Sequence, residues 1–191
     1  MSPASRRRRK PVASEALPED EPAATAKIVS SAHLADGGAP ELSEFEYGLI
    51  VSANAFNHWV TRCMAAAGAP DLGTLDVLVL HTVNHRDRAK RLSDICFTLK
   101  VEDTHLVNYA LKKLLKAGFV EATKSGKETR YTASEAGAAL CRRYRHVRES
   151  CLIDSMAALG GVDTDEIARA ASVLRALSGL YDQAARAATS L

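Results

Sequence analysis

The sequence has few aromatic residues and no long hydrophobic run. Aromatic side chains make up 5% of the 191 residues, and the longest aliphatic run is Val77–Leu80. Because a membrane-spanning helix needs about 20 apolar residues, we expect no transmembrane segment. A secretory signal is not expected either, since a proline and three acids at 18–21 stand where its apolar segment should follow the basic residues. We therefore expect a cytoplasmic protein with no membrane partner.

Cysteine is scarce and the four thiols are widely spaced, without a C-x-x-C pair: Cys63, Cys96, Cys141 and Cys151. Their positions in predicted helices favour small, buried or half-buried hydrophobic side chains over a disulfide framework. A redox sensor would need an accessible thiol with a lowered pKa. Cys63 and Cys151 stay open as candidates for that role, because both lie on helices that we expect at a subunit interface.

Sequence signals of catalysis are also missing. The chain contains no phosphate-binding P-loop motif, no G-x-S-x-G motif and no cluster of metal ligands. His81 and His85 are four residues apart on one predicted helix, which is a metal-ligand spacing, but no third ligand lies near them in the sequence. We therefore expect neither an enzyme nor a bound metal or cofactor.

Residues 41–191 are expected to form one mainly α (α+β) domain, with long helices at about 43–67 and 134–188 around a central part at about 73–133. Ser43 and Glu46 form a capping box at the start of the first helix. Asp163 caps the last helix, in which apolar residues recur at a 3-4 spacing: Ile167, Ala170, Leu174, Leu177, Tyr181 and Ala184. Such a seam is typical of a helix that packs against a partner, so we predict a homodimer.

The central part predicts two helices joined by a tight turn. Leu92–Leu99 forms the first helix, 100–102 the turn, and the second helix runs from its N-cap, Asp103 or Glu102, to Lys116 before Gly118. The predicted core face of the second helix consists of Leu106, Ala110, Leu111, Leu114 and Leu115. Its opposite face carries Thr104, His105, Asn108, Tyr109 and Lys112.

A β-hairpin follows this helix pair. Residues 119–124 and 128–132 are predicted strands, and Gly126 supplies the positive φ of the turn between them. Two helices and a hairpin in this order form a winged helix-turn-helix, which reads duplex DNA. Between His85 and Arg130 the sequence contains eleven Lys or Arg and six Asp or Glu. This excess of basic residues is typical of a phosphate-binding surface.

Helix-turn-helix docking assigns a role to each polar residue. Asn108 is placed to pair with adenine, and Thr104 and His105 with purine edges. Lysines further along the helix, Lys112 and Lys113, are expected at phosphates. In the hairpin, Lys127 and Arg130 are expected beside the minor groove. Residues 1–40 are expected to be disordered, and their basic run at 6–10 either enters a minor groove or stays a solvated tail, blunted by acids at 15 and 19–21.

These motifs resemble those of the MarR family of bacterial transcription regulators, over about Leu42 to Ala188. The family's Leu-x-x-x-Gly-aromatic-Val pattern is found at Leu114, Gly118, Phe119 and Val120, and its helix start after the wing is found at 133–137 with Ser134 as N-cap. Arg130 falls near the family's wing arginine. The aspartate that usually precedes that arginine is absent, and the wing is short.

The resemblance implies a winged helix-turn-helix with long N- and C-terminal dimerisation helices. It implies a homodimeric, sequence-specific regulator, more often a repressor than an activator, acting on a palindromic DNA site. Family members commonly bind small phenolic effectors between the dimer helices and the DNA-binding lobe, which makes His58, Trp59 and Arg62 candidate effector ligands here. The alternative is a winged-helix module that binds another protein through the same face.

Overall fold

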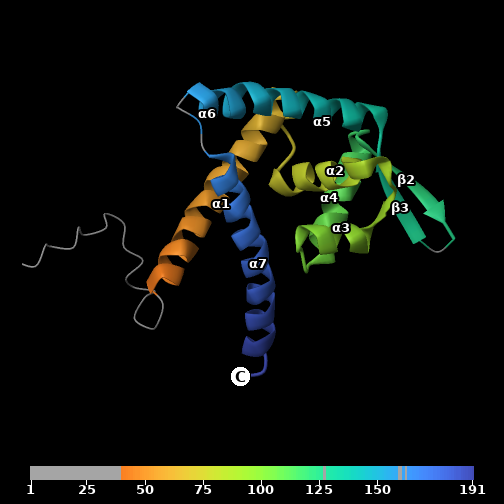
Figure 1. The fold of residues 1–191 in the computed structure, drawn as a ribbon. Helices are drawn as coiled ribbons and strands as arrows, with labels where there is room; N and C mark the ends of the chain where they lie inside the picture. The colour runs from red at the N-terminus through yellow and green to blue at the C-terminus, as the bar shows by residue number, and fades with distance from the viewer. Residues whose placement is uncertain (1–39, 127, 159–160, 162) are drawn as a thin grey trace, which may run out of the picture. The chain divides into compact units, whose positions relative to one another are not determined.

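The first helix begins at a proline. The computed structural model describes residues 40–126, 128–158, 161 and 163–191, and helix α1 spans Pro40–Ala66 (Figure 1). Proline suits the first helical position, where no backbone N–H is needed. The prediction that Ser43 is the N-cap is therefore wrong, since Ser43 lies inside the helix. The described residues divide within α1 into two compact units, and the features below belong to the unit that starts at Val51. The predicted N-terminal tail lies outside the described residues except for Pro40, which is the first residue of α1.

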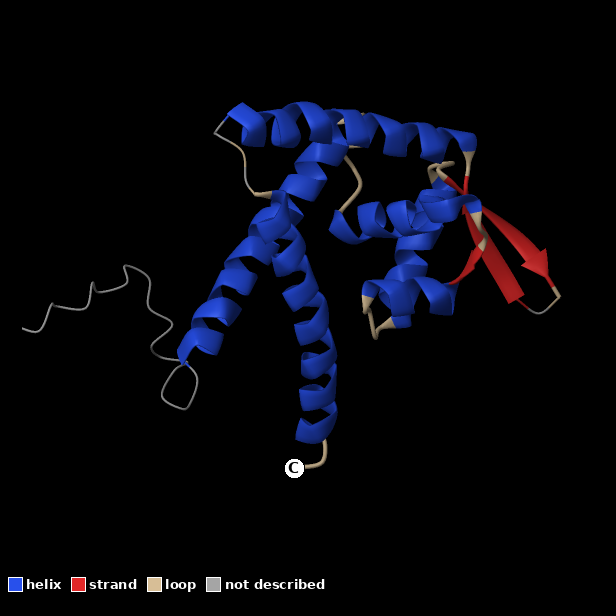
Figure 2. Cartoon of the chain, in the orientation of Figure 1, coloured by secondary structure: helices blue, strands red, loops and turns tan. Residues whose placement is uncertain are grey.

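Helices and a small antiparallel sheet make up this unit, as Figure 2 shows. The remaining helices are α2 (Thr74–Asn84), α3 (Leu92–Leu99), α4 (Thr104–Lys116), α5 (Glu135–Arg148), α6 (Asp154–Ala158) and α7 (Thr164–Ala188). The strands are β1 (Lys90–Arg91), β2 (Val120–Ser125) and β3 (Glu128–Ala133), in the order β1-β3-β2. The predicted fold class is thereby confirmed. Among the described residues, no helix combines the length and the apolar composition that crossing a membrane requires.

Side-chain N-caps stand at the start of three of these helices. Asp103, Ser134 and Asp163 cap α4, α5 and α7 as predicted, each accepting a backbone N–H of the first turn. The start of α2 differs from the prediction. Thr74 is its first helical residue rather than its cap, and the carboxylate of Asp76 instead accepts the N–H of Gly73 at 2.9 Å.

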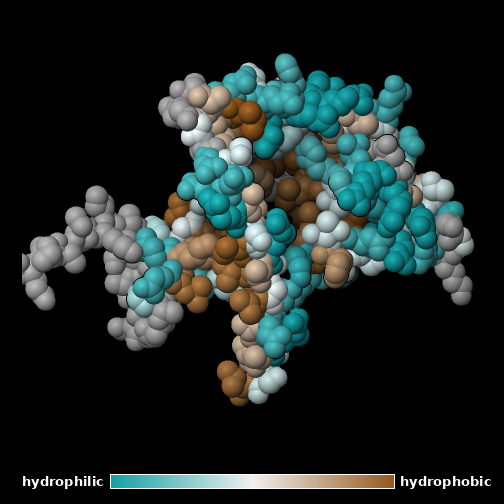
Figure 3. Space-filling view, viewed as in Figure 1, coloured by the Kyte–Doolittle hydropathy of each residue, from teal (hydrophilic) through white to brown (hydrophobic). Residues whose placement is uncertain are grey.

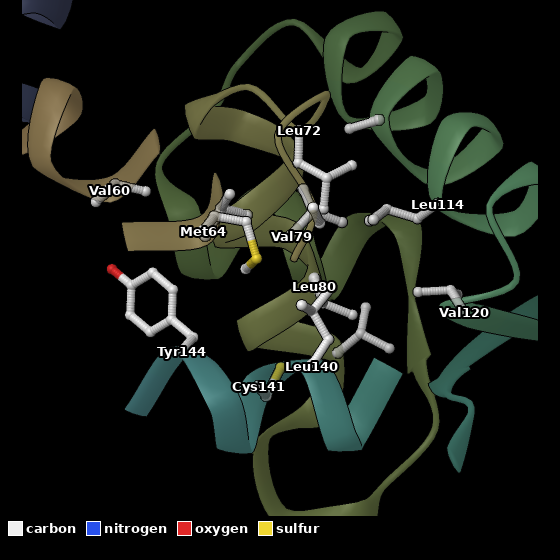
Figure 4. Close-up of a cluster of buried hydrophobic side chains, with 14 of the residues drawn as sticks. Val60, Met64, Leu72, Val79, Leu80, Leu114, Val120, Leu140, Cys141 and Tyr144 are labelled. Atoms are coloured by element: carbon white, nitrogen blue, oxygen red, sulfur yellow. The ribbon is translucent and has the colours of Figure 1, made fainter. Parts of the chain in front are cut away.

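Helix α2 lies at the centre of the core and packs against α3, α4 and α5 (Figure 1). In the close-up of Figure 4, Met64 of α1 lies near Leu80 of α2, and Leu140 of α5 approaches from the other side. Helix α4 contributes Val107 and not the predicted Leu106, whose side chain is 53% exposed. The reason is helical phase, since the buried positions of α4 follow one stripe: Val107, Ala110, Leu111 and Leu114.

A π-helical segment interrupts the helix that was predicted to run unbroken from Ser134 beyond Met156. It covers Glu149–Ile153, between α5 and α6. A π turn holds one more residue than an α turn, so an uninterrupted heptad pattern could not predict it. Within this segment Cys151 is exposed, which corrects the expectation of a buried or half-buried thiol at that position.

The other three thiols are buried, as the hydrophobic interpretation predicted. Burial raises the pKa of Cys63 and raises the pKa of Cys141 to about 11. The Cys63 thiol also donates to the carbonyl of Tyr144 at 3.5 Å. A buried thiol with a raised pKa is a poor nucleophile, which argues against Cys63 as a redox sensor.

His81 of α2 is a polar side chain beside the hydrophobic core, and it makes the free energy of unfolding depend on pH. Its ring meets that of Tyr144 edge to face at 4.6 Å, and its Nε2 has no hydrogen-bond partner among the described residues. Burial, and secondarily the charge of Arg145, lowers the pKa of His81 below 6.5. The folded state therefore holds a neutral ring, whereas the unfolded chain takes up a proton once the pH falls below 6.5.

We expect the free energy of unfolding to fall as the pH drops below 6.5, by at most about 1.4 kcal/mol per pH unit from this group. The loss ends at the lowered pKa of the folded state. In urea denaturation at a series of pH values, His81→Leu should remove this part of the acid sensitivity. Parallel pH profiles for the wild type and the variant would contradict this account.

Candidate nucleic-acid interface

The exposed face of α4 carries most of the residues predicted to read DNA. Thr104, His105, Tyr109 and Lys112 are exposed and Asn108 is half-buried, while the opposite face of the helix lies in the core. Tyr109 is 71% exposed, which is unusual for a large aromatic ring. Asp103 is engaged as the N-cap, accepting the N–H of His105 at 2.8 Å. The face that the sequence predicted is thus presented on one rigid helix.

Lys113 lies on a different side of α4 from these residues. Its Nζ donates to the carboxylate of Asp76 and to the carbonyl of Asp71, both at 2.6 Å. Asp76 is buried, and its carboxylate also accepts the N–H of Gly73. The structure therefore gives Lys113 a partner within the domain, tying α4 to the start of α2, rather than the free position expected of a phosphate ligand.

The wing is the hairpin β2–β3, with Val120 paired to Ala133 and Ser125 to Glu128. Gly126 has the positive φ that the sequence predicted, at 63°. Lys127, the other predicted wing contact, lies outside the described residues. Arg130 is exposed on β3, and its guanidinium lies 3.4 Å from the carboxylate of Glu128. Glu128 thus supplies a carboxylate two residues before Arg130, where the motif that the sequence resembles has an aspartate.

Arg91 was not among the predicted site residues, because the two-residue strand β1 (Lys90–Arg91) has no propensity signal of its own. Arg91 pairs with Arg130 in the sheet register and with two carboxylates, at 3.1 Å to Asp94 and 3.3 Å to Glu128. The hydrogen bonds that Arg91 donates to Asp94 and Glu128 raise the pKa of Arg91, and those to Asp94 lower the pKa of that carboxyl. These exposed pairs contribute little to stability, but they link β1, α3 and the wing.

A close backbone contact fixes the wing against α5. The Ser134 hydroxyl donates to the carbonyl of Gly118 at 2.6 Å, and the Ser134 N–H donates to the carbonyl of Phe119 at 3.1 Å. One turn into α5, a Cβ on Gly137 would lie 2.0 Å from that same Phe119 oxygen. Only glycine permits this approach, which explains the glycine of the helix-start motif.

Helix α7 presents its predicted seam without burying it. None of its 25 residues is buried, and Ile167 and Leu174 are 44% and 43% exposed. Figure 3 shows apolar surface, in brown and tan, along this helix. Such a helix is typical of a surface that a partner covers.

The candidate effector ligands do not converge on one cavity wall. His58 and Arg62 are exposed on α1, where the Arg62 Nε donates to the His58 Nε2 at 3.3 Å, and Trp59 packs against the core. A cavity of about 380 Å³ opens beside other positions of the same helix. It is lined by Phe56, Val60, Val77, Leu78, His81, Asn84, Cys141, Tyr144, Arg145 and Arg148.

Comparison with known proteins supports the winged-helix assignment of this region. Residues 72–137 match the family model of a winged helix DNA-binding domain, which spans α2 to the first turn of α5. No curated protein matched the sequence of the chain.

Several solved structures share the fold at low sequence identity. A MarR family transcription regulator is 14% identical, with a TM-score of 0.61 over 81% of this chain and 97% of its own. A MarR family regulator from Rhodococcus sp. RHA1 is 13% identical, with a TM-score of 0.60 over 74% and 96%. A mutant MarR from E. coli, complexed with operator DNA, is 17% identical, with a TM-score of 0.53 over 68% and 93%. The chain therefore has the fold of the MarR family transcription regulators, and its residues 72–137 match a winged helix DNA-binding domain.

Proposed function

We propose that this protein is a homodimeric, sequence-specific transcription regulator that binds a palindromic DNA site and represses transcription. The observation that carries the proposal is the exposed polar face of α4, held on a core-packed helix next to a wing. A helix of this kind enters the major groove, where its N-terminal residues meet base edges. The DNA complex of the E. coli MarR mutant, which has the same fold, supports this choice of ligand.

The residues divide by role along the proposed interface. Thr104, His105 and Asn108 read base edges from the first two turns of α4, and Lys112 meets a phosphate. Leu106 joins them, because its exposed side chain suits the methyl group of thymine. Arg130 and Lys127 bind the backbone beside the wing. Lys113 is not included among the proposed DNA ligands, because its ammonium is bonded to Asp76.

The dimer follows from α7. Its exposed seam needs a partner, and a two-fold axis places two copies of α4 in successive major grooves, about ten base pairs apart. In this assembly a small effector would use the 380 Å³ cavity beside α1 and α5, which has an apolar wall and two arginines, in preference to His58, Trp59 and Arg62.

The proposal is tested by selecting bound sequences from a random duplex pool with the full-length protein. We expect a palindromic consensus whose half-sites lie about one helical turn apart. Placed before a reporter gene, that site should lower expression when the protein is present. An unenriched pool would contradict sequence-specific binding, and raised expression would contradict repression.

Asn108→Ala gives a sharper test of base reading. We expect it to cost about 1–3 kcal/mol on the selected site and to change binding to unrelated duplexes little. Fluorescence anisotropy with both duplexes measures the difference. An equal loss on both would make Asn108 a backbone contact.

The alternative is a protein-binding module, favoured by the large exposed side chains Phe97 of α3 and Tyr109 of α4. Salt dependence separates the two functions, because the logarithm of DNA affinity falls by about 0.9 per phosphate contact for each tenfold rise in salt. A steep slope on duplex DNA supports the regulator, whereas absence of duplex binding supports the module.

A further inference from the structure

Lys100 holds an unusual backbone position in the turn between α3 and α4. It is the C-cap of α3 and adopts the left-handed conformation, with φ 55° and ψ 39°. Glycine or asparagine normally takes this position, since a Cβ is strained there. Three residues later Asp103 caps the recognition helix α4. Lys100 therefore lies just before the helix end that we place in the major groove.

The side chain of Lys100 is tied to the distant helix α7. Its ammonium forms an ion pair with the carboxylate of Asp182, and both side chains are partly exposed, at 55% and 39%. A hollow of about 760 Å³ lies around the pair, with Phe97 and Val101 on one wall and Tyr181 and Arg186 on the other. The hydrogen bond from Lys100 lowers the pKa of Asp182, as expected for a carboxylate held charged.

The pair stands apart from the other ion pairs of this region. Lys113, Arg91 and Arg130 pair with carboxylates of the winged domain itself: Asp76, Asp94 and Glu128. Lys100, in contrast, has its ion-pair partner on α7. An ion pair within the winged domain stays intact when the domain binds DNA, whereas the Lys100–Asp182 pair depends on the position of α7.

We propose that Lys100 is a phosphate ligand of the DNA interface and that Asp182 is its intramolecular competitor, a carboxylate standing in for a DNA phosphate. This rests on the proposed function. The turn before a recognition helix lies near the DNA backbone, and a lysine ammonium exchanges one oxygen anion for another by rotating its flexible stem. Because the pair is exposed and therefore weak, a DNA phosphate can displace Asp182. Breaking the ion pair costs free energy, which lowers the affinity for DNA.

The competition is tested with D182N, K100A and the double variant of the full-length protein, on the duplex selected above. We expect D182N to bind about two- to fivefold more tightly, the range expected for release of an exposed ion pair. K100A should bind more weakly, with a salt slope lower by about 0.9. The double variant should match K100A, because without the ammonium Asp182 has nothing to hold.

Other results would overturn the inference. If D182N tightened binding equally with and without Lys100, Asp182 would act only by general repulsion of DNA. If D182N weakened binding, the pair would position the turn instead of competing for it. E166Q is the matched control, since it removes the same charge from the opposite end of α7, and it should leave affinity nearly unchanged. K100R should retain the wild-type salt slope.

The two proposals fail in different ways. If the wild type bound no duplex, the proposed function would fail. If the wild type bound duplex and lost affinity on Asn108→Ala, but D182N changed nothing, only the competition would fail.

Discussion

Replacing Gly137 by alanine is expected to destabilise the protein strongly, although alanine is the better helix former by about 1 kcal/mol. The new Cβ would lie 2.0 Å from the carbonyl oxygen of Phe119, and neither backbone can move without loosening the wing or α5. Overpacking of a core costs about 1–3 kcal/mol, and occasionally more. Taking the upper end of that range and subtracting the gain in helix propensity, we expect a net loss of about 2 kcal/mol, which corresponds to a fall in Tm of roughly 4–8 °C for a chain of this size. Differential scanning calorimetry measures it.

Gly179→Ala provides the matched control. Gly179 also lies in a helix, α7, but a Cβ there meets nothing within 4 Å. The same substitution should therefore leave Tm unchanged or raise it slightly. If both variants behaved alike, the contact between α5 and Phe119 would not limit stability.

Leu174→Asp combined with Leu177→Asp is expected to give a monomer. Both residues lie on the apolar seam of α7, where Leu174 is exposed and Leu177 half-buried in the single chain. In a dimer built on this seam each copy would bury two unpaired charges, at several kcal/mol each. The Kd of the dimer should rise at least about a thousandfold, and analytical ultracentrifugation should report a monomer mass at micromolar concentration.

Ser172→Asp with Gln183→Asp introduces the same charges on the opposite side of α7, where both residues are exposed. This control should remain dimeric and bind the palindrome normally. A dimer mass for the leucine variant would exclude α7 from the interface, whatever its effect on DNA binding.

The sequence predicted what local patterns determine. The caps Asp103 and Ser134, the turn at Gly126 and the polar face of α4 all follow from residue type and spacing within one element. The apolar seam of α7 likewise follows from the 3-4 spacing of its residues. The winged-helix order of elements follows from these local signals, so the fold class could be predicted from the sequence.

What the sequence did not predict depends on contacts between distant elements. Strand β1 forms because its backbone pairs with the edge of β3. Lys113 bonds to Asp76 on α2, which lies 37 positions away in the sequence. The helical periodicity of α4 cannot predict a contact with another helix. Leu106 is an exception, because the spacing of Val107, Ala110, Leu111 and Leu114 already pointed to the buried stripe.

The π-helical segment after α5 has a consequence for the fourth cysteine. Leu140, Tyr144 and Val147 face inward on α5, and an unbroken α-helix would bring Cys151 to that face four residues later. The additional residue of the π turn shifts the phase, so that Leu152 and Met156 are half-buried while Cys151 is exposed. A single inserted amino acid thereby brings a thiol to the surface with no substitution at the cysteine itself. Deleting one residue between 149 and 151, with the cysteine kept, should return it to the interior and protect it from alkylating reagents.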